Sequence, residues 1–495
     1  MKLTKFFIDQ HGCAKNQVDG EIIINRLLNN GMQQTFLPEE ADFIIINSCG
    51  FIESAKKESL DAVYGAKKQY PNAKVLLAGC LAERYAELFK EQLPEADAII
   101  GNGNLEKIDT VVKQMLSGKR PVEKYVQEGV CTGERKVLLG YKGSAFIKIT
   151  EGCSNHCSFC AIPVIRGELR SRPAQSIINE ISDLYKKGVV EFNLIGQDLA
   201  AYGTGEGDNV FGTGRTKLPE WKDGKNLGTK EESALARLLK MISELKGNFI
   251  VRPLYIHPDH FNQDILSVMQ KDKRLLPYFD IPFQSGSENI IHRMNRLGSP
   301  TEYLNLISNI KKALPNATIR TTFLTGFPGE TEEEANETVE FLNKLQSDWS
   351  GCFPYSREED TPAYSFKNRV KANVSKKRAE KLCAVQAEIT KKHLTSYVGK
   401  EFDILIEEIV SGTEGLAIGR AWFQASEVDG NVVVRYEKEV GNEKDFVKTG
   451  RFVRAKIVAS GDVDLDAIFV GDSPFNENAE KKENESLIYA PEIRN

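Results

Sequence analysis

Apolar runs alternate with amphipathic stretches through the N-terminal part of the chain. The runs KFFID, DFIIINS, AKVLLAG and DAIIG are short and continuously apolar, as in strands that are buried on both faces. Stretches with helical spacing lie between them, such as VDGEIIINRLLNN, which ends at Gly31. This alternation over about the first 105 residues predicts a parallel sheet with crossover helices, and a linker that contains LSGKRPVEK follows it. We place the N-terminal domain at residues 1–125.

The same alternation returns with longer spacing from about residue 140. Repeated strand-plus-helix units over about 235 residues are typical of a βα barrel or part of one, and we place this domain at residues 140–375. The expected helices cover residues 175–187, 233–246, 261–270, 301–314 and 331–346. Residues 204–232 interrupt the pattern with six glycines and little apolar periodicity, so we expect a flexible insertion and a candidate lid there.

The pattern changes again after a charged helical stretch at residues 374–394. Short β-type runs such as EFDILIEEI, NVVVRYE and RFVRAKIVA, separated by Gly and Asp, predict a small antiparallel β domain at residues 396–470. The last segment, residues 471–495, contains NENAEKKENE and is expected to be a disordered tail. The predicted fold class is therefore α/β, with an N-terminal parallel-sheet domain, a central partial (βα) barrel and a small antiparallel β domain.

The composition narrows the class of protein. Hydrophobic residues make up 41% and charged residues 27%, which is ordinary for a globular protein and unlike a disordered one. The net charge of −5 disfavours a chain that binds nucleic acid mainly by neutralising phosphates. Apolar runs such as FIII are too short to span a bilayer and the first residues lack a secretory pattern, so we expect a cytoplasmic protein without a membrane partner.

A cluster of cysteines carries the most specific chemical signal. The segment TEGCSNHCSFC follows the apolar run SAFIKIT directly and holds Cys153, Cys157 and Cys160 in CxxxCxxC spacing. Three thiolates so close on one loop suit three irons of a 4Fe-4S cluster and leave the fourth iron open for a small ligand. The alternative is a zinc site completed by His156 or a distant residue, although zinc fingers usually present their ligands as two separated pairs.

Three further cysteines each lie within a few residues of the C-terminal end of a predicted strand. Cys13 follows KFFID, Cys49 follows DFIIINS, and Cys80 follows AKVLLAG. Parallel strands bring these ends to one edge of the sheet, so thiols that are 36 and 31 positions apart can converge. Any one of them alone is more often a core residue. Their repeated placement favours an auxiliary 4Fe-4S cluster, again with one iron unclaimed.

Polar residues also stand at the C-terminal ends of the predicted barrel strands, which is the edge where such barrels bind their ligands. They belong to the segments IGQD, RPLYIHP, IPFQSGS and RTTFLTGFPGE. Strand-end capping or a salt bridge inside the barrel is the alternative interpretation for each. The candidates for contacting a ligand are Gln197, Asp198, Arg252, His257, Gln284, Arg320 and Glu330.

The CxxxCxxC motif at the end of a first barrel strand resembles the radical S-adenosylmethionine (SAM) superfamily. The resemblance implies that Cys153, Cys157 and Cys160 hold a 4Fe-4S cluster whose open iron chelates SAM, and that reduction of the cluster cleaves SAM to a 5′-deoxyadenosyl radical. It also implies an electron donor as a partner. The polar strand-end residues then become candidates for contacts with SAM or substrate.

Almost the whole chain resembles the methylthiotransferases of this superfamily, which carry an auxiliary cluster and a C-terminal TRAM domain. These enzymes replace a C–H bond with C–S–CH3 and use SAM both as methyl donor and as radical source. HGCAKNQVDGE, AIPVIRGELRSRP, IGQDLAAYG and GRAWFQASEVDG are similar to the branch that modifies a ribosomal protein. The transfer-RNA branch typically reads GCQMN around the first cysteine. The resemblance implies as target the β-carbon of an aspartate in the twelfth small-subunit ribosomal protein, and the alternative target is an adenosine of transfer RNA.

The charge of the predicted β domain bears on that choice. Residues 397–470 contain nine Lys plus Arg and fourteen Asp plus Glu, a net charge of −5. Such a domain should repel RNA phosphates and attract a basic protein, and ribosomal proteins are basic. We therefore expect a basic small-subunit ribosomal protein to dock on the TRAM domain, and transfer RNA is disfavoured. A non-catalytic iron–sulfur carrier is the alternative of another class, and it would bind two clusters without cleaving SAM.

Overall fold

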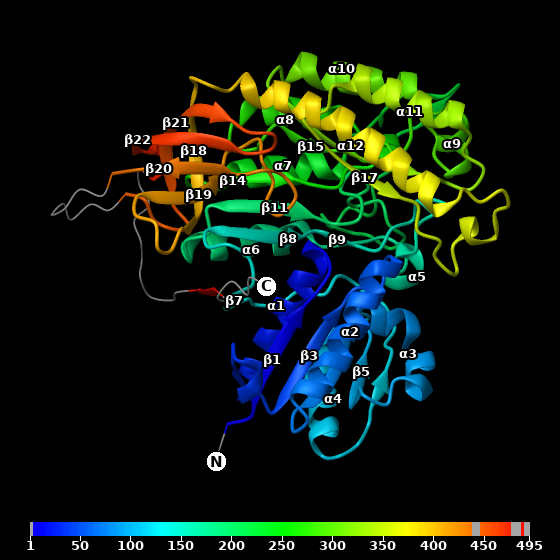
Figure 1. Ribbon diagram of the computed structural model, residues 1–495, viewed down its shortest axis with the longest axis vertical. Helices are drawn as coiled ribbons and strands as arrows, with labels where there is room; N and C mark the ends of the chain where they lie inside the picture. The colour runs from blue at the N-terminus through cyan, green and yellow to red at the C-terminus, as the bar shows by residue number, and fades with distance from the viewer. Residues whose placement is uncertain (1–2, 438–445, 477–486, 490–495) are drawn as a thin grey trace.

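The computed structural model describes residues 3–437, 446–476 and 487–489. In Figure 1 the N-terminal domain lies below a larger body, in which the barrel domain and the small β domain stand next to each other. Among the described residues, no helix has both the length and the apolar character needed to cross a membrane.

A six-stranded parallel sheet forms the N-terminal domain, in the order β2-β1-β3-β4-β5-β6. The strands β3 and β4 are buried almost throughout because α1 and α4 cover one face of the sheet and α2 and α3 cover the other. The predicted parallel sheet with crossover helices is confirmed. Its elements are β1 (Lys5–Gln10), α1 (Ala14–Asn29), β2 (Gln33–Gln34), β3 (Phe43–Ser48), α2 (Glu53–Gln69), β4 (Lys74–Gly79), α3 (Cys80–Gln92), β5 (Ala98–Ile100), α4 (Ile108–Leu116) and β6 (Val122–Glu123).

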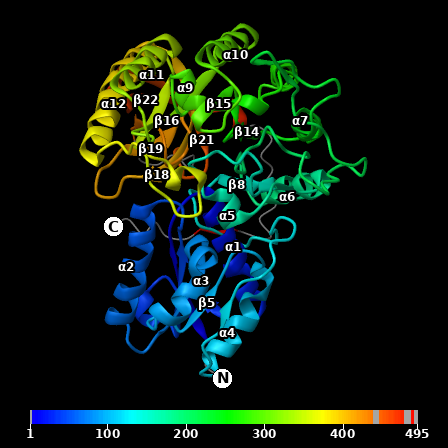
Figure 2. The ribbon, with the colours of Figure 1, turned by 90° about the vertical axis from the view of Figure 1, so that its right-hand side faces the viewer.

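Two three-stranded parallel sheets, β14-β11-β8 and β15-β16-β17, form the predicted partial barrel. Helices cover its outer surface, as Figures 1 and 2 show. The elements are β8 (Ser144–Lys148), α5 (Ile162–Arg166), α6 (Ala174–Lys186), β11 (Glu191–Ile195), α7 (Ala234–Glu244), β14 (Ile250–Pro253), α8 (Asp264–Lys271), β15 (Tyr278–Asp280), α9 (Glu288–Arg293), α10 (Pro300–Ala313), β16 (Thr318–Thr325), α11 (Glu332–Leu345), β17 (Trp349–Pro354) and α12 (Ala372–Thr395).

The C-terminal strands close into a small barrel in the order β18-β19-β20-β22-β21. All neighbouring pairs are antiparallel except β20 and β22, which run parallel, so the predicted antiparallel domain is confirmed with one exception. The strands are β18 (Glu401–Ile409), β19 (Leu416–Arg420), β20 (Val432–Arg435), β21 (Phe452–Ser460) and β22 (Leu465–Asp472).

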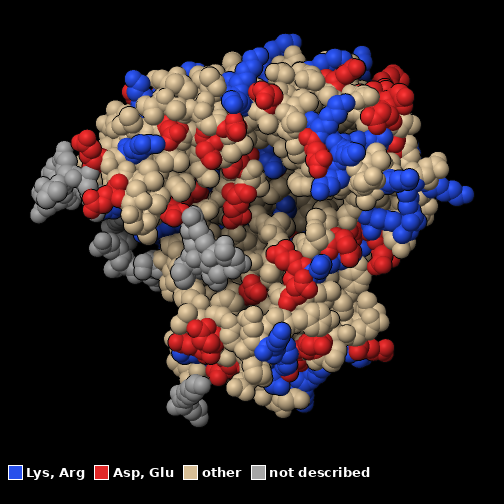
Figure 3. All heavy atoms as spheres, in the orientation of Figure 1, with Lys and Arg blue, Asp and Glu red and all other residues tan. Residues whose placement is uncertain are grey.

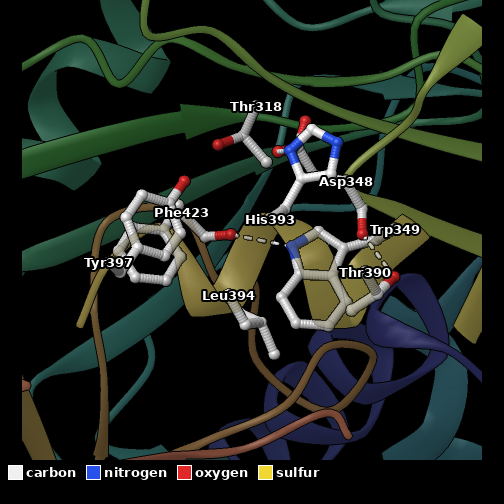
Figure 4. Close-up of a pocket in the computed structure, with 8 residues that line it drawn as sticks. All are labelled: Thr318, Asp348, Trp349, Thr390, His393, Leu394, Tyr397 and Phe423. Atoms are coloured by element: carbon white, nitrogen blue, oxygen red, sulfur yellow. Dashed lines mark hydrogen bonds and ion pairs between the residues drawn. The ribbon is translucent and has the colours of Figure 1, made fainter. Parts of the chain in front are cut away.

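One hydrophobic core joins the three domains. It contains Val18 and Ile22 of α1, Ile250 of β14, and the inward-facing residues of the small barrel, such as Ile404. At its edge, the pocket in Figure 4 has the stacked rings of Tyr397 and Phe423 on one side and Trp349 on the other. The indole Nε1 donates a hydrogen bond of 3.0 Å to the carbonyl oxygen of Phe423. The buried ring of Phe423 thus serves packing, and the small barrel is fixed against the βα barrel.

Two segments differ from expectation. The insertion at residues 204–232 contains a hairpin of β12 (Trp221–Lys222) and β13 (Lys225–Asn226), and the Trp221 Nε1 donates to the carbonyl oxygen of Asp259 at 2.8 Å. It is thus bound to the barrel by specific contacts. In the predicted tail, Ile488–Tyr489 (β23) pairs with Val137–Leu138 (β7), and residues 471–476 are ordered as the end of β22 and a 3-10 turn. Residues 477–486 and 490–495 of that prediction lie outside the described residues.

Candidate active site

The ends of three neighbouring strands bring Cys13, Cys49 and Cys80 together. They follow β1, β3 and β4, which are adjacent in the sheet, and Cys49 interacts electrostatically with both other thiols. Gly12 permits this approach, because its backbone has φ +88° and a Cβ there would stand only 3.1 Å from the Cβ of Cys49. The predicted convergence of the three cysteines at one sheet edge is therefore observed.

An arginine from the barrel domain reaches this group. Arg166 is the last residue of α5, and its Nη2 donates to the Sγ of Cys80 at 3.2 Å and to the Oδ2 of Asp19 at 2.9 Å. Its Nη1 pairs with Glu151, and Lys148 completes the buried network by contacting both carboxylates. Because Asp19 lies in α1 and the other charged groups lie in the barrel domain, the network joins the two domains beside the thiols.

The three thiols differ in acidity. Protein atoms packed around the sulfur of Cys13 raise its pKa, although the residue as a whole remains exposed. The positive charges of Lys15 and Arg166 outweigh this effect, and the net shift is downward. Burial and the neighbouring Cys80 raise the pKa of Cys49 to about 12. Burial also raises the pKa of Cys80, against the opposing charge of Arg166. The adjacent cations therefore stabilise negative charge at this site, which suits thiolate ligands.

The second group of thiols comes from one loop. Cys153, Cys157 and Cys160 follow β8, and the loop is closed by hydrogen bonds from the Cys160 amide to the Cys157 carbonyl at 2.9 Å and from the Cys153 amide to the Gly167 carbonyl at 3.0 Å. The Nε2 of His257 lies 3.8 Å from the Sγ of Cys157. Burial raises the pKa of all three thiols, that of Cys160 to about 12, while Arg296 opposes the shift at Cys157.

The donor set fits iron–sulfur clusters. All nine cysteines are free, and each site offers three thiols, the soft ligands that such clusters use. Within the described ranges, no group of three His, Cys, Asp or Glu side chains is arranged to hold a single metal ion. His156, the candidate fourth zinc ligand, is largely exposed, and its Nε2 faces the Oε1 of Glu168 at 3.4 Å. Cubane ligands bind separate irons, so their thiolates stand farther apart than the ligands of one ion.

Both glutamines among the predicted strand-end residues have free hydrogen-bonding capacity. The Oε1 atoms of Gln197 and Gln284 are buried without a hydrogen-bond partner among the described residues. Gln284 also has φ +71°, a backbone conformation that is unfavourable for a non-glycine residue. Unpartnered buried acceptors are expected at a site that awaits a ligand. These two residues remain candidates for contacts with SAM or substrate.

Other strand-end candidates are already engaged within the protein. Asp198 accepts from the Nδ2 of Asn155 at 3.1 Å and contacts the Nδ1 of His260 at 2.6 Å. Glu330 accepts from the Gly326 amide and from Arg378, each at 2.7 Å. These carboxylates therefore shape the loops at the strand ends.

The two predicted arginines lie at the junction with the small barrel. Arg252 is fully buried, pairs with Glu191 at 2.9 Å, and donates to the Trp422 carbonyl at 2.7 Å. Arg320 pairs with Asp280 at 3.2 Å and lies 3.5 Å from Asp429. For Arg252, the alternative interpretation from the sequence is therefore the observed one, because its side chain forms a salt bridge inside the barrel.

Sequence reasoning missed the cations beside the thiols. Arg166 lies six residues after Cys160 in AIPVIRG, and Arg296 follows α9, yet neither was singled out. Lys15 forms part of the motif HGCAKNQVDGE, but the sequence indicated no role of its own for it. An arginine shortly after a cysteine motif is a usable signal, because cations stabilise thiolates.

Three known families match parts of the chain. They are "Uncharacterized protein family UPF0004" over residues 5–101, the "Radical SAM superfamily" over residues 147–342 and the "TRAM domain" over residues 398–470. The three matches correspond to the parallel-sheet domain, the partial barrel and the small β-barrel.

Relatives match nearly the whole chain. "Ribosomal protein uS12 methylthiotransferase RimO" of Treponema denticola is 51% identical over 94% of this chain and 100% of its own length. The protein of the same name from Thermotoga maritima is 36% identical over 88% of this chain and 95% of its own. Among solved structures, the radical S-adenosylmethionine methyltransferase TsrM from Kitasatospora setae matches with a TM-score of 0.50 and 11% identity, over 73% of this chain and 77% of that one. This structural likeness shows a shared fold.

Proposed function

We propose a function for this chain, which belongs to the RimO family of ribosomal protein uS12 methylthiotransferases. It adds a methylthio group to the β-carbon of an aspartate in uS12, using two 4Fe-4S clusters and SAM. The enzyme is a radical SAM methylthiotransferase. The observation that carries the proposal is the presence of two separate groups of three free thiols, one of which is contacted by Arg166 from the helix that follows the other group.

Each group of cysteines has its own task in this proposal. Cys153, Cys157 and Cys160 hold the cluster that binds SAM, and the three N-terminal cysteines hold the auxiliary cluster. When bound, the clusters and SAM supply the hydrogen abstraction, the sulfur and the methyl group. The protein positions the two sites, and Gln197 and Gln284 offer buried acceptors for SAM or substrate. Arg166 connects the auxiliary site to the helix after the radical SAM cysteines, since it is the last residue of α5 and donates to Cys80.

The charge of the TRAM domain supports a protein substrate. Its net charge of −5 favours a basic ribosomal protein over RNA. Figure 3 shows a hollow near the middle of the molecule, with acidic side chains at several places along its rim and basic atoms inside. A basic loop of uS12 would complement such a rim, and we propose that it docks on the TRAM domain and enters the hollow.

Mass spectrometry provides the test. We expect uS12 from cells that contain the protein to carry one methylthio group, which fragmentation places on an aspartate, and uS12 from cells lacking the gene to be unmodified. Transfer-RNA nucleosides from the same cells should not change. A methylthio group that disappears from transfer RNA instead would establish the alternative substrate. Purified, reduced protein that forms no 5′-deoxyadenosine from SAM would refute the radical mechanism.

A further inference from the structure

Lys15 is a buried cation without a carboxylate partner. The residue is only 8% exposed and lies two positions after Cys13, on whose thiol its charge acts. Among the described residues it makes no ion pair, and its Nζ lies over the ring of Tyr255, 3.2 Å from the ring centroid. Buried ammonium groups are normally paired, because an unpaired charge loses its hydration without compensation. An isolated buried cation in a site is therefore a candidate ligand-binding group.

The surroundings of Lys15 come from all three domains. Tyr255 follows β14 and has φ +63°, an unfavourable conformation that puts its ring beneath the ammonium. Tyr255 interacts electrostatically with Asp280 at the end of β15 and with Glu427 of the small barrel. Asp280, the carboxylate with the largest electrostatic effect on Lys15, already pairs with Arg320 at 3.2 Å. Lys15 thus lies where the auxiliary site, the barrel strand ends and the TRAM domain meet. The Cys13 thiol is the negative group that acts on it most strongly, and no carboxylate of the described residues forms an ion pair with it there.

We propose that Lys15 binds the carboxylate of the target aspartate and holds its β-carbon beside the auxiliary cluster. This inference rests on the proposed function and names the group that recognises its substrate. The aspartate carboxylate is one bond from the β-carbon that is modified, so an ion pair with Lys15 fixes the reacting carbon at the site. Binding the anion also compensates the buried ammonium, which makes recognition selective for a charged side chain.

A cycle of two changes tests this ion pair. Lys15→Met removes the positive charge and keeps a side chain of similar length. A uS12 peptide with Asn at the target position removes the carboxylate. We expect Lys15→Met to lower kcat/KM for the Asp peptide on the order of 100-fold and to change that for the Asn peptide less than about threefold. The preference for Asp over Asn should largely disappear. The cycle cancels the different intrinsic reactivity of the two side chains.

Binding measurements and matched variants separate this role from others. Calorimetry with the cluster-loaded protein should show the same loss of affinity for the Asp peptide alone. Lys15→Arg should restore part of the preference, and Lys57→Met, which removes an exposed lysine of α2, should leave it intact. Equal losses on both peptides, loss of the auxiliary cluster's iron, or weaker SAM binding by Lys15→Met would each overturn the inference. Absence of uS12 modification by the unaltered enzyme would instead refute the proposed function.

Discussion

Cys153, Cys157 and Cys160 come from a single loop, whereas Cys13, Cys49 and Cys80 come from the ends of three strands. The loop site needs only local structure, and burial raises the pKa of all three of its thiols. The strand-end site needs the folded sheet, and it also receives Arg166 from another domain. Formation of the auxiliary site is therefore tied to domain docking, while the radical SAM site is tied to one loop.

Single cysteine substitutions should separate the two sites most strongly. Cys153→Ala removes a thiolate of the radical SAM cluster and should abolish SAM cleavage. Cys13→Ala should retain part of that cleavage and lose all sulfur insertion, because the radical SAM loop is intact. Iron content should fall from about eight to about four per chain in each variant. Chromatography with mass detection measures 5′-deoxyadenosine and methylthiolated peptide.

Cys383→Ala serves as the matched control, since Cys383 is exposed on α12 outside both groups. It should keep both activities and the full iron content. If Cys13→Ala lost SAM cleavage and sulfur insertion equally while retaining its circular dichroism spectrum, separate roles for the two sites would be excluded.

The arginine beside each site offers a finer comparison. Arg166→Met leaves Asp19 and Glu151 with Lys148 as their remaining buried partner, so we expect unfolding free energy to fall on the order of 3 kcal/mol in urea titrations. Loss of the positive charge beside Cys80 should also make the auxiliary cluster harder to reduce. Arg296→Met removes the arginine that interacts with Cys157 and should shift the reduction potential of the radical SAM cluster alone.

Potentiometric titration followed by electron paramagnetic resonance measures both shifts. A more negative potential of the auxiliary cluster in Arg166→Met, with the other potential unchanged, is the expected result. If Arg166→Met moved both potentials equally, its effect would be general to the fold and the two sites would not be electrostatically separate.

The same contrast explains what the sequence could predict. The succession of strands and helices along the chain follows from alternating apolar runs, and CxxxCxxC can be recognised because its cysteines lie close together in the sequence. The convergence of Cys13, Cys49 and Cys80 was predictable from parallel topology. The contacts of Arg166 with Cys80 and of Arg252 with the TRAM domain depend on how whole domains dock, which no local pattern encodes. For that reason the strand-end position of Arg252 suggested a ligand contact, and its actual partners are Glu191 and the Trp422 carbonyl.

Thiol acidity gives the smallest expected difference between the sites and a test that needs no activity. With the clusters removed by a chelator under anaerobic conditions, iodoacetamide should alkylate Cys13 first, because Lys15 and Arg166 lower its pKa and it is exposed. Cys160, whose pKa burial raises to about 12, should react at least about 30-fold more slowly at pH 8, after allowing for the greater nucleophilicity of its thiolate.

The lowered pKa of Cys13 means that its thiolate forms at lower pH, so its alkylation should level off below the pH at which Cys160 begins to react. Peptide mapping across a pH series measures both rates. Equal rates for the two thiols would show that the cations at the auxiliary site do not set its acidity, and the electrostatic contrast between the sites would then be wrong even if both hold clusters.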